Sequence, residues 1–207
     1  MAHLSWLYRK LLYGKKIRLA LFFGMAFLLL FFAGTANAFA GTLTVTNISP
    51  PSLSTEQGTV VAGEILQLHA SPENTITVTG MKVIISGARD SDLNLVKLVK
   101  DVNGNNSFDN GVDQILASTT TAGGVAEFSA PNIISIAANT TETIFVVFEI
   151  SNSATVGATI QSSLPDQSYI TVSDTDVVAP FSNYYGTVIT IEDKPDTLLV
   201  SQLAPPT

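Results

Sequence analysis

The sequence of 207 residues contains no cysteine. This absence excludes disulfide scaffolds, thiolate metal sites and cysteine nucleophiles. Histidine is nearly missing too, because only His3 and His69 are present and His3 lies in a basic leader. Little therefore remains for histidine-based acid–base chemistry, and we do not expect an enzyme. Charged residues make up only 13% of the chain and hydrophobic residues 46%, so we expect a folded domain stabilised by an apolar core.

Positive and negative charges are separated along the sequence. The first 40 residues contain five basic side chains and no acidic one, whereas the remainder has five basic and 17 acidic residues and a net charge of −12. A surface this acidic repels phosphate backbones, so the sequence argues against nucleic-acid binding. The same negative charge favours association with cations, Ca²⁺ among them.

Residues 1–40 have the organisation of a secretory signal peptide. An uncharged apolar stretch from Leu19 to Ala33 follows the basic segment, and small residues then offer cleavage after Ala38 or Ala40. The apolar stretch is shorter than the roughly 20 residues that cross a bilayer, although extending it to Ala40 makes an uncleaved anchor the alternative. In both cases the remainder is expected to be exported, either secreted or at the cell surface, and to meet a membrane only through the leader.

Residues 41–193 have the pattern of a β-sandwich domain. Threonine and valine are abundant, turn residues separate short apolar or alternating runs, and no stretch of a dozen residues has a helical period with caps. About ten short strands without intervening helices indicate an all-β, antiparallel Greek-key sandwich. The expected strands are Leu43–Ile48, Glu64–Ala70, Ile76–Ile85, Leu93–Lys100, Ile115–Thr119, Val125–Phe128, Ile144–Ile150 and Val188–Glu192, with weaker candidates at Ala158–Ser162 and Ile170–Val172. Within Ile144–Ile150, the continuous apolar run Ile144–Phe148 predicts a central strand.

The start of this domain is repeated near the end of the chain. Thr42–Ser52 and Thr197–Thr207 are identical at five of eleven positions, and both segments end in Pro-Pro before the last residue. One interpretation is chance similarity between β-rich strands. The other is that residues 194–207 contain a second opening strand, which either begins another domain of a tandem array or is donated to a neighbouring subunit.

Strand donation predicts which side chains form the contact between subunits. Residues of the first repeat are the leading candidates for the donor strand, and those of the second are their equivalents. The expected contact residues are Thr42, Leu43, Val45 and Ile48 in the first repeat and Leu198, Val200 and Leu203 in the second.

One loop has a metal-binding pattern. Residues 101–113 read Asp-Val-Asn-Gly-Asn-Asn-Ser-Phe-Asp-Asn-Gly-Val-Asp and connect two expected strands. A tight coil that turns alternate oxygen-bearing residues inward suits a hard cation such as Ca²⁺. The expected ligands are side-chain oxygens of Asp101, Asn103, Asn105, Asp109 and Asp113 and the backbone carbonyl of Ser107.

The match of this loop to the EF-hand spacing is partial. Asn106 replaces the usual glycine, and Val112 stands where the bidentate glutamate belongs, so Asp113 is the expected substitute. The alternative is a polar hairpin loop whose side chains cap their own backbone. If Ca²⁺ binds, its role should be structural and its affinity weak, with a dissociation constant of about 10⁻⁴ to 10⁻³ M.

Other polar motifs have less specific interpretations. Asn47 and Asn139 are glycosylation candidates by the Asn-x-Ser/Thr pattern, which Asn105 also matches. His69 is expected at the surface of its strand, because no second histidine completes a metal site. The aromatic residues of 180–186 form either a contact patch for a partner or sugar or a loop folded back onto the sandwich.

Several of these stretches together resemble the β-sandwich domains that occur, often in tandem, in large secreted surface proteins of bacteria and archaea. The similar stretches are Glu64–Leu68, Ser86–Ala88, Asp92–Leu98, Asp101–Asn105, Phe108–Gly111, Phe128–Ser129 and Ile144–Phe148. More loosely, the chain is similar to fibre subunits of biofilm matrices and to archaeal bundling pili, in which donated strands link subunits. The resemblance implies adhesion, surface coating or filament formation, and no catalysis.

The sequence thus favours a non-catalytic extracellular structural protein. We expect a homopolymeric filament, pilus or surface layer whose subunits join by strand donation. The alternative is a calcium-dependent adhesin, or a module that binds carbohydrate or another cell-surface partner, possibly as a fragment of a tandem-domain protein.

Overall fold

A computed structural model describes residues 40–49, 52–173 and 175–195 of the chain. The predicted signal peptide, except Ala40, and the second repeat with Leu198, Val200 and Leu203 lie outside these residues. The described part consists of β-strands and two short 3₁₀ turns, η1 (Asp90–Asp92) and η2 (Gln167–Tyr169). It contains no helix with the length and hydropathy needed to span a bilayer.

The first layer is a six-stranded sheet with the order β12-β1-β3-β9-β5-β6. Its strands are β1 (Thr42–Asn47), β3 (Val60–Ala70), β5 (Leu93–Lys100), β6 (Gln114–Thr119), β9 (Thr141–Ile150) and β12 (Val177–Val178). Strand β9 pairs with β3 on one side and with β5 on the other, which confirms the central position expected from its continuous apolar run.

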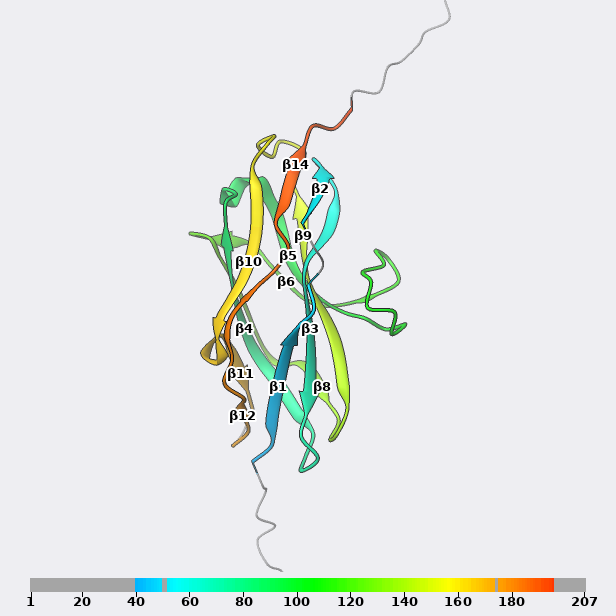
Figure 1. Cartoon of the computed structure of the whole chain (residues 1–207), viewed down its shortest axis with the longest axis vertical. Helices are drawn as coiled ribbons and strands as arrows, with labels where there is room; N and C mark the ends of the chain where they lie inside the picture. Colours follow the sequence, from blue (N-terminus) through cyan, green and yellow to red (C-terminus); the bar gives the residue numbers. More distant parts are fainter. Residues whose placement is uncertain (1–39, 50–51, 174, 196–207) are drawn as a thin grey trace, which may run out of the picture. The chain divides into compact units, whose positions relative to one another are not determined.

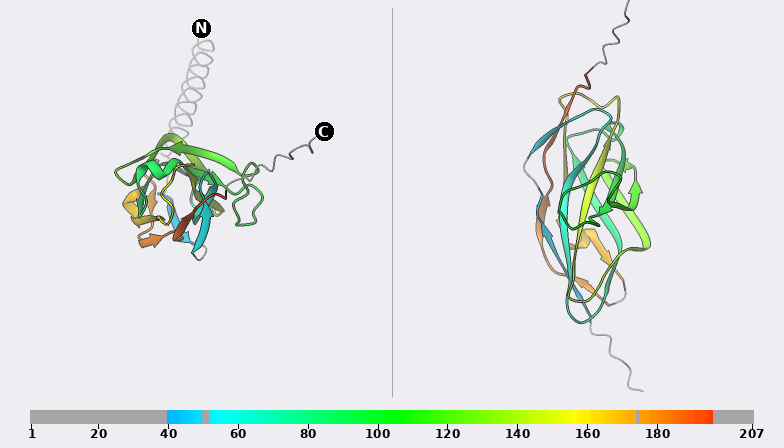
Figure 2. Two further views of the ribbon diagram at one scale, coloured as in Figure 1. Left: turned by 90° about the horizontal axis from the view of Figure 1, so that it is seen from above. Right: turned by 90° about the vertical axis from the view of Figure 1, so that its right-hand side faces the viewer.

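The second layer is an eight-stranded sheet that follows the path β2-β14-β10-β4-β8-β7, with β11 paired to β4 and β13 paired to β10. Its strands are β2 (Leu53–Glu56), β4 (Ile76–Ser86), β7 (Thr121–Ala122), β8 (Val125–Ile136), β10 (Thr159–Asp166), β11 (Ile170–Val172), β13 (Ser182–Tyr185) and β14 (Ile189–Glu192). Figures 1 and 2 show the two layers and the long strands β3, β4, β8 and β9 that run through them.

The structure confirms the all-β sandwich and places a strand at each of the ten expected segments. The sheets differ from the purely antiparallel expectation because β1 pairs in parallel with β12, and β2 pairs in parallel with β14. The short strands β2, β7, β12 and β13 were not expected, since two to four residues carry too little alternation to be recognised in a sequence. Strand β8 also continues to Ile136, well beyond the expected Val125–Phe128.

The core fills the space between the two sheets. Side chains that alternate along each strand point inward, and Leu66, Leu98, Phe148 and Ile160 are almost completely buried. Each fully buried aliphatic or aromatic side chain of this kind contributes about 1.5 to 3 kcal/mol. Because the sequence contains no cysteine, this core stabilises the domain without the help of disulfides.

A second, smaller apolar cluster lies on strands of the six-stranded sheet, separate from the main core. It consists of Ile65, Val99, Phe145 and Val147, with Phe108 packed against it from the loop after β5. Phe145 is fully buried and Val99 nearly so. Because these residues alternate with inward-pointing neighbours such as Val146 and Leu98, the cluster belongs to the outer face of the sheet. The sheet is therefore apolar on both faces where β3, β9 and β5 meet.

Candidate functional site

The predicted metal-binding loop projects from the sandwich between β5 and β6, as Figures 1 and 2 show. Its first residue is fixed to the sheet, because the backbone N–H of Asp101 donates a hydrogen bond of 3.0 Å to the carbonyl of Thr143 on β9. The Thr143 hydroxyl also donates to the side-chain carbonyl of Asn106 at 3.0 Å. The loop is thus attached to β9 as well as to the strands that it connects.

Asp101 organises the first half of the loop. Its carboxylate is only 5% exposed and accepts hydrogen bonds of 2.7 Å from the backbone N–H groups of Gly104 and Asn106. Both residues have left-handed backbone conformations, with φ of 72° and 56°. Asparagine tolerates this region, which explains how Asn106 occupies the position where the EF-hand pattern has glycine.

Asp113 closes the base of the loop. Its carboxylate is 8% exposed and accepts a hydrogen bond from the backbone N–H of Val102 at 3.2 Å and from that of Asp109 at 2.7 Å. One side chain therefore ties the beginning and the second half of the loop together. These bonds are to backbone groups, and the expected role of Asp113 as a metal ligand in place of the missing glutamate stays a prediction.

Three of the expected ligands meet in the middle of the loop. The side-chain amides of Asn103 and Asn105 each donate a 2.8 Å hydrogen bond to the same carboxylate oxygen of Asp109, Oδ2. These donors hold the pKa of Asp109 below its usual range. The oxygen atoms of the two amides accept backbone N–H groups of Asn105 and Ser107, at 3.1 and 2.8 Å.

The structure therefore brings together Asn103, Asn105 and Asp109, while Asp101 and Asp113 bind backbone amides at the two ends of the loop. No cluster of three or more acidic or histidine side chains that could hold a metal occurs in the part of the chain that is described. The donor set itself suits a hard cation, because it offers carboxylate and amide oxygens and no basic side chain. Each amide could turn its oxygen towards a cation beside Asp109 only by giving up the backbone N–H group that this oxygen now accepts.

The loop also covers the outer apolar cluster. The ring of Phe108 packs edge-on against Phe145, with centroids 6.0 Å apart and an interplanar angle of 65°. Such aromatic pairs are worth about 0.5 to 1.5 kcal/mol beyond the area that they bury. Residues that hold the loop in place therefore also hold Phe108 in its position over Phe145. This packing was not expected from the sequence, where Phe108 was only one apolar residue in a polar run.

The first candidate donor strand, β1, pairs with a strand of its own chain. It is antiparallel to β3 from Leu43 to Asn47, and Leu43 and Val45 are buried, whereas Ile48 is 38% exposed. On the other edge of β1, Thr42 and Leu43 pair with β12. The Tyr184 hydroxyl donates to the Val45 carbonyl at 2.9 Å. Donation of this strand to another subunit would require all of these bonds to break, and its donor role stays a prediction.

The glycosylation candidates differ in accessibility. The Asn47 amide nitrogen, at the end of β1, donates to the Tyr185 carbonyl at 2.9 Å and to Glu64 Oε1 at 3.3 Å. Asn105 is likewise engaged with Asp109. Asn139 is exposed in the turn between β8 and β9, with φ of 57°. Of these three residues, Asn139 is therefore the most accessible glycosylation candidate.

The aromatic segment 180–186 turns inward for the most part. Phe181 and Tyr184 stack with centroids 4.6 Å apart and an interplanar angle of 5°, and both pack against the core. Tyr185 is 56% exposed. The segment thus folds back onto the sandwich, as one of the two sequence interpretations expected.

Sequence reasoning missed a buried acid between the sheets. Glu64 lies on β3 among inward-pointing residues and has no exposed surface, and Oε2 has no hydrogen-bond partner among the described residues. Ser162 on β10 faces it but makes no hydrogen bond of ordinary geometry. Burial raises the pKa of Glu64 to about 7, against a smaller opposing influence of Ser162. The sequence did contain a sign of this burial, because Glu64 occupies the same alternating positions of the strand as the buried Leu66 and Leu68.

Among the described residues, long unpaired edges occur at β6 and at β8, because β7 pairs only with Val125 and Ala126 of β8. Strand β6 pairs with β5 and is the end of the six-stranded sheet, whereas the opposite end, β12, has two residues. The ends of the other sheet, β2 and β7, have four and two residues. Exposed apolar side chains gather at β6 and the adjoining loop, where Val102, Val112 and Ile115 are 50%, 61% and 56% exposed.

Comparison with known proteins gives similarity in solved structures only. No family model and no curated protein matches the chain. A chain of a dockerin–cohesin complex matches 73% of this chain and 99% of its own length, with 17% identity and a TM-score of 0.33. A family 123 glycoside hydrolase from Clostridium perfringens matches 74% of this chain, with 8% identity and a TM-score of 0.38. The match spans 27% of that hydrolase. Similarity at this level does not indicate a function for the present chain.

Proposed function

We propose that the chain is a non-catalytic, exported structural subunit whose copies associate by adding a β-strand to the β6 edge. The observation that carries this proposal is the unpaired edge of β6 together with the exposed Ile115 on it. An unprotected edge offers a row of free N–H and C=O groups and accepts a strand with suitable alternation. The signal peptide predicted from the sequence supports the export of the subunit.

The position of β1 favours strand addition over strand replacement. A donated strand could replace β1 only if five pairs with β3 and the Tyr184 bond to Val45 were broken. Addition at β6 breaks no pairing of the described sheets. We propose Leu198–Leu203, within the second repeat, as the incoming strand, because its sequence resembles that of β1.

The loop of residues 101–113 would support this edge. It joins β5 to β6, and its exposed Val102 and Val112 extend the apolar surface around Ile115. We propose that Ca²⁺ binds beside Asp109 and stiffens the loop, with Asp101, Asn103, Asn105, Ser107 and Asp113 as further ligands. The role of the ion is structural, and it acts through the position of the loop and of Phe108.

The size of the assembly in solution tests the proposal. The mature chain, residues 41–207, is compared by light scattering after size exclusion with Ile115→Lys, which places a charge on the edge. A chain that ends at residue 195 is included. We expect concentration-dependent association of the mature chain and monomers for both variants. Val156→Lys is the matched control, because Val156 is 51% exposed in a loop away from β6, and it should associate normally.

Two outcomes would contradict the proposal. One is a mature chain that stays monomeric at every concentration reached. The other is association that persists unchanged in Ile115→Lys and in the shortened chain, since the contact would then lie elsewhere on the molecule.

A further inference from the structure

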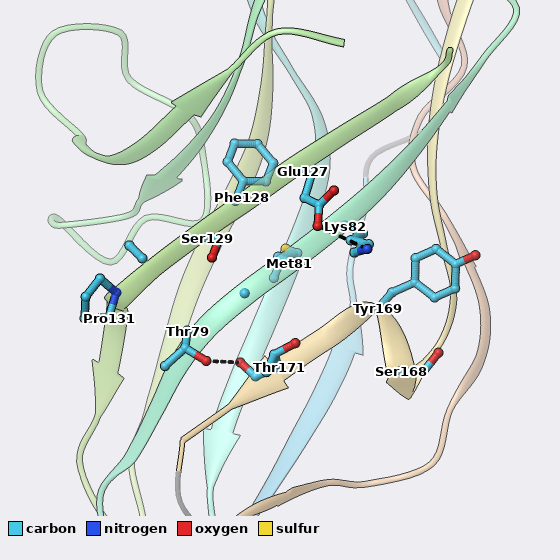
Figure 3. A pocket seen from close by; sticks show the side chains of 12 residues that line it. Thr79, Met81, Lys82, Glu127, Phe128, Ser129, Pro131, Ser168, Tyr169 and Thr171 are labelled. Carbon is cyan, nitrogen blue, oxygen red and sulfur yellow. Dashed lines mark hydrogen bonds and ion pairs between the residues drawn. The ribbon is translucent and has the colours of Figure 1, made fainter. Parts of the chain in front are cut away.

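A furrow crosses the outer face of the eight-stranded sheet, on strands that take no part in the β6 edge. Its lining includes Gly80 of β4, which has no side chain to fill the space. Figure 3 shows the neighbouring residues Thr79 and Lys82 of the same strand. One wall is formed at an irregularity of β8, where Ala130 and Pro131 line the furrow. Between the pairs Gly80–Ser129 and Val78–Ile134, β8 has four residues, 130–133, and β4 has one. The opposite wall is the turn η2, which brings Tyr169 over the sheet.

The furrow has two hollows that share one group of side chains. The first has a volume of about 490 Å³ and the second about 540 Å³, and both are lined by Lys82, Glu127, Ser168 and Tyr169. Lys82 and Glu127 face each other across β4 and β8 with a 3.1 Å contact between Nζ and Oε1, and their side chains are 54% and 61% exposed. Figure 3 shows this ion pair beside the ring of Tyr169.

The chemistry of the furrow is polar and locally neutral. Lys82 and Glu127 balance each other's charge, and the hydroxyls of Thr79, Ser129 and Thr171 lie along the first hollow. Tyr169 is half-buried, with part of its ring packed against the core. A rigid aromatic face beside closely spaced donors and acceptors suits a molecule with apolar C–H faces and many hydroxyl groups.

We propose that this furrow binds a neutral polysaccharide chain. Tyr169 contacts the C–H face of a sugar ring, and Lys82 and Glu127 hydrogen-bond its hydroxyl groups. The net charge of −12 on residues 41–207 opposes binding of anionic glycans. The two hollows are open and both border the ion pair, so they fit neighbouring sugar units of a chain better than a small enclosed ligand. Binding here is independent of strand addition at β6.

Affinity electrophoresis in native gels tests this site. The mature protein is run in gels without polysaccharide and in gels that contain mannan, xylan, β-glucan or dextran as neutral probes and alginate as an anionic one. We expect retardation by at least one neutral polysaccharide, none by alginate, and loss of the retardation in Tyr169→Ala and Glu127→Gln. Glu192→Gln is the matched control, because it removes an exposed carboxylate from β14, and it should be retarded like the wild type.

Each variant is compared with its own mobility in the gel without polysaccharide, so that its changed charge does not affect the result. Glu127→Gln changes an exposed side chain and should fold even if Tyr169→Ala does not. Failure of all four neutral polysaccharides to retard the wild type would overturn the proposal. Retardation that is unchanged in Glu127→Gln and Tyr169→Ala would overturn it as well.

Discussion

At the scale of single residues, Glu64 has the most unusual environment of the described chain. It is fully buried between two sheets, and none of the ion pairs among the described residues involves it. Glu64 Oε1 accepts a hydrogen bond from the side-chain amide of Asn47, which also donates to the Tyr185 carbonyl. The acid therefore helps to hold the end of β1 against β3 and β13 while lacking a charged partner of its own.

The pKa of Glu64 predicts how stability depends on pH. Folding raises this pKa from 4.5 to about 7. Between these pH values, Glu64 is mostly protonated in the folded state and mostly ionised in the unfolded state. The contribution of the protonated Glu64 to the free energy of unfolding is complete below pH 4.5 and falls as the pH rises towards 7. It is absent above the pKa of the folded state. A shift of this size corresponds to at most roughly 3 to 4 kcal/mol at 1.36 kcal/mol per unit.

Glu64→Gln tests this dependence, because glutamine keeps the shape of the side chain without its ionisation. We expect the free energy of unfolding of the wild type to decrease between pH 5 and pH 8 relative to that of the variant. Denaturant unfolding at both pH values measures the difference. Parallel pH dependence of the two proteins would show that Glu64 does not titrate in this range.

At the scale of elements, the loop 101–113 and the sheet beneath it stabilise each other. Asp101 and Asp113 bind backbone amides at the ends of the loop, and Phe108 covers Phe145. A cation beside Asp109 would add its binding energy to the folded state only, because the unfolded chain does not assemble the oxygen ligands.

Thermal unfolding in CaCl₂ and in chelator measures that contribution. Ca²⁺ at ten times its dissociation constant stabilises by about 1.4 kcal/mol, which raises the midpoint by roughly 3 to 5 °C for a domain of this size. Asp109→Asn should lose the increase, because it removes the central charge, while Asp193→Asn, an exposed control at the end of the domain, should keep it. Identical midpoints of the wild type in both buffers would show that Ca²⁺ does not stabilise the folded domain.

The elements also show what the sequence could and could not predict. Strands such as Leu93–Lys100 were recognised because alternation and flanking turn residues are local signals. The parallel pairings of β1 with β12 and of β2 with β14 depend on partners far apart in the chain, which local pattern does not encode. In the loop, the spacing of aspartate and asparagine residues was enough to indicate the candidate ligands. The hydrogen bonds of Asp101 and Asp113 to backbone groups, and the packing of Phe108, required the three-dimensional structure.

At the scale of the whole molecule, the two surfaces proposed for interaction lie on different parts of the sandwich. Strand β6 ends the six-stranded sheet, whereas the furrow lies over β4 and β8 of the other sheet. An assembly joined at β6 would therefore leave the furrow accessible. A structural subunit that also binds polysaccharide could anchor an extracellular matrix or layer while polymerising.

Hydrogen–deuterium exchange of the mature chain, at low and high protein concentration, tests strand addition most directly. An added strand forms hydrogen bonds with the outward backbone amides of Gln114–Thr119, so we predict that exchange of β6 slows with concentration while that of β1 stays constant. The Ile115→Lys variant should show no such slowing. Slower exchange at β1 or β12 with β6 unchanged, or no concentration dependence anywhere in the two sheets, would contradict the proposed assembly.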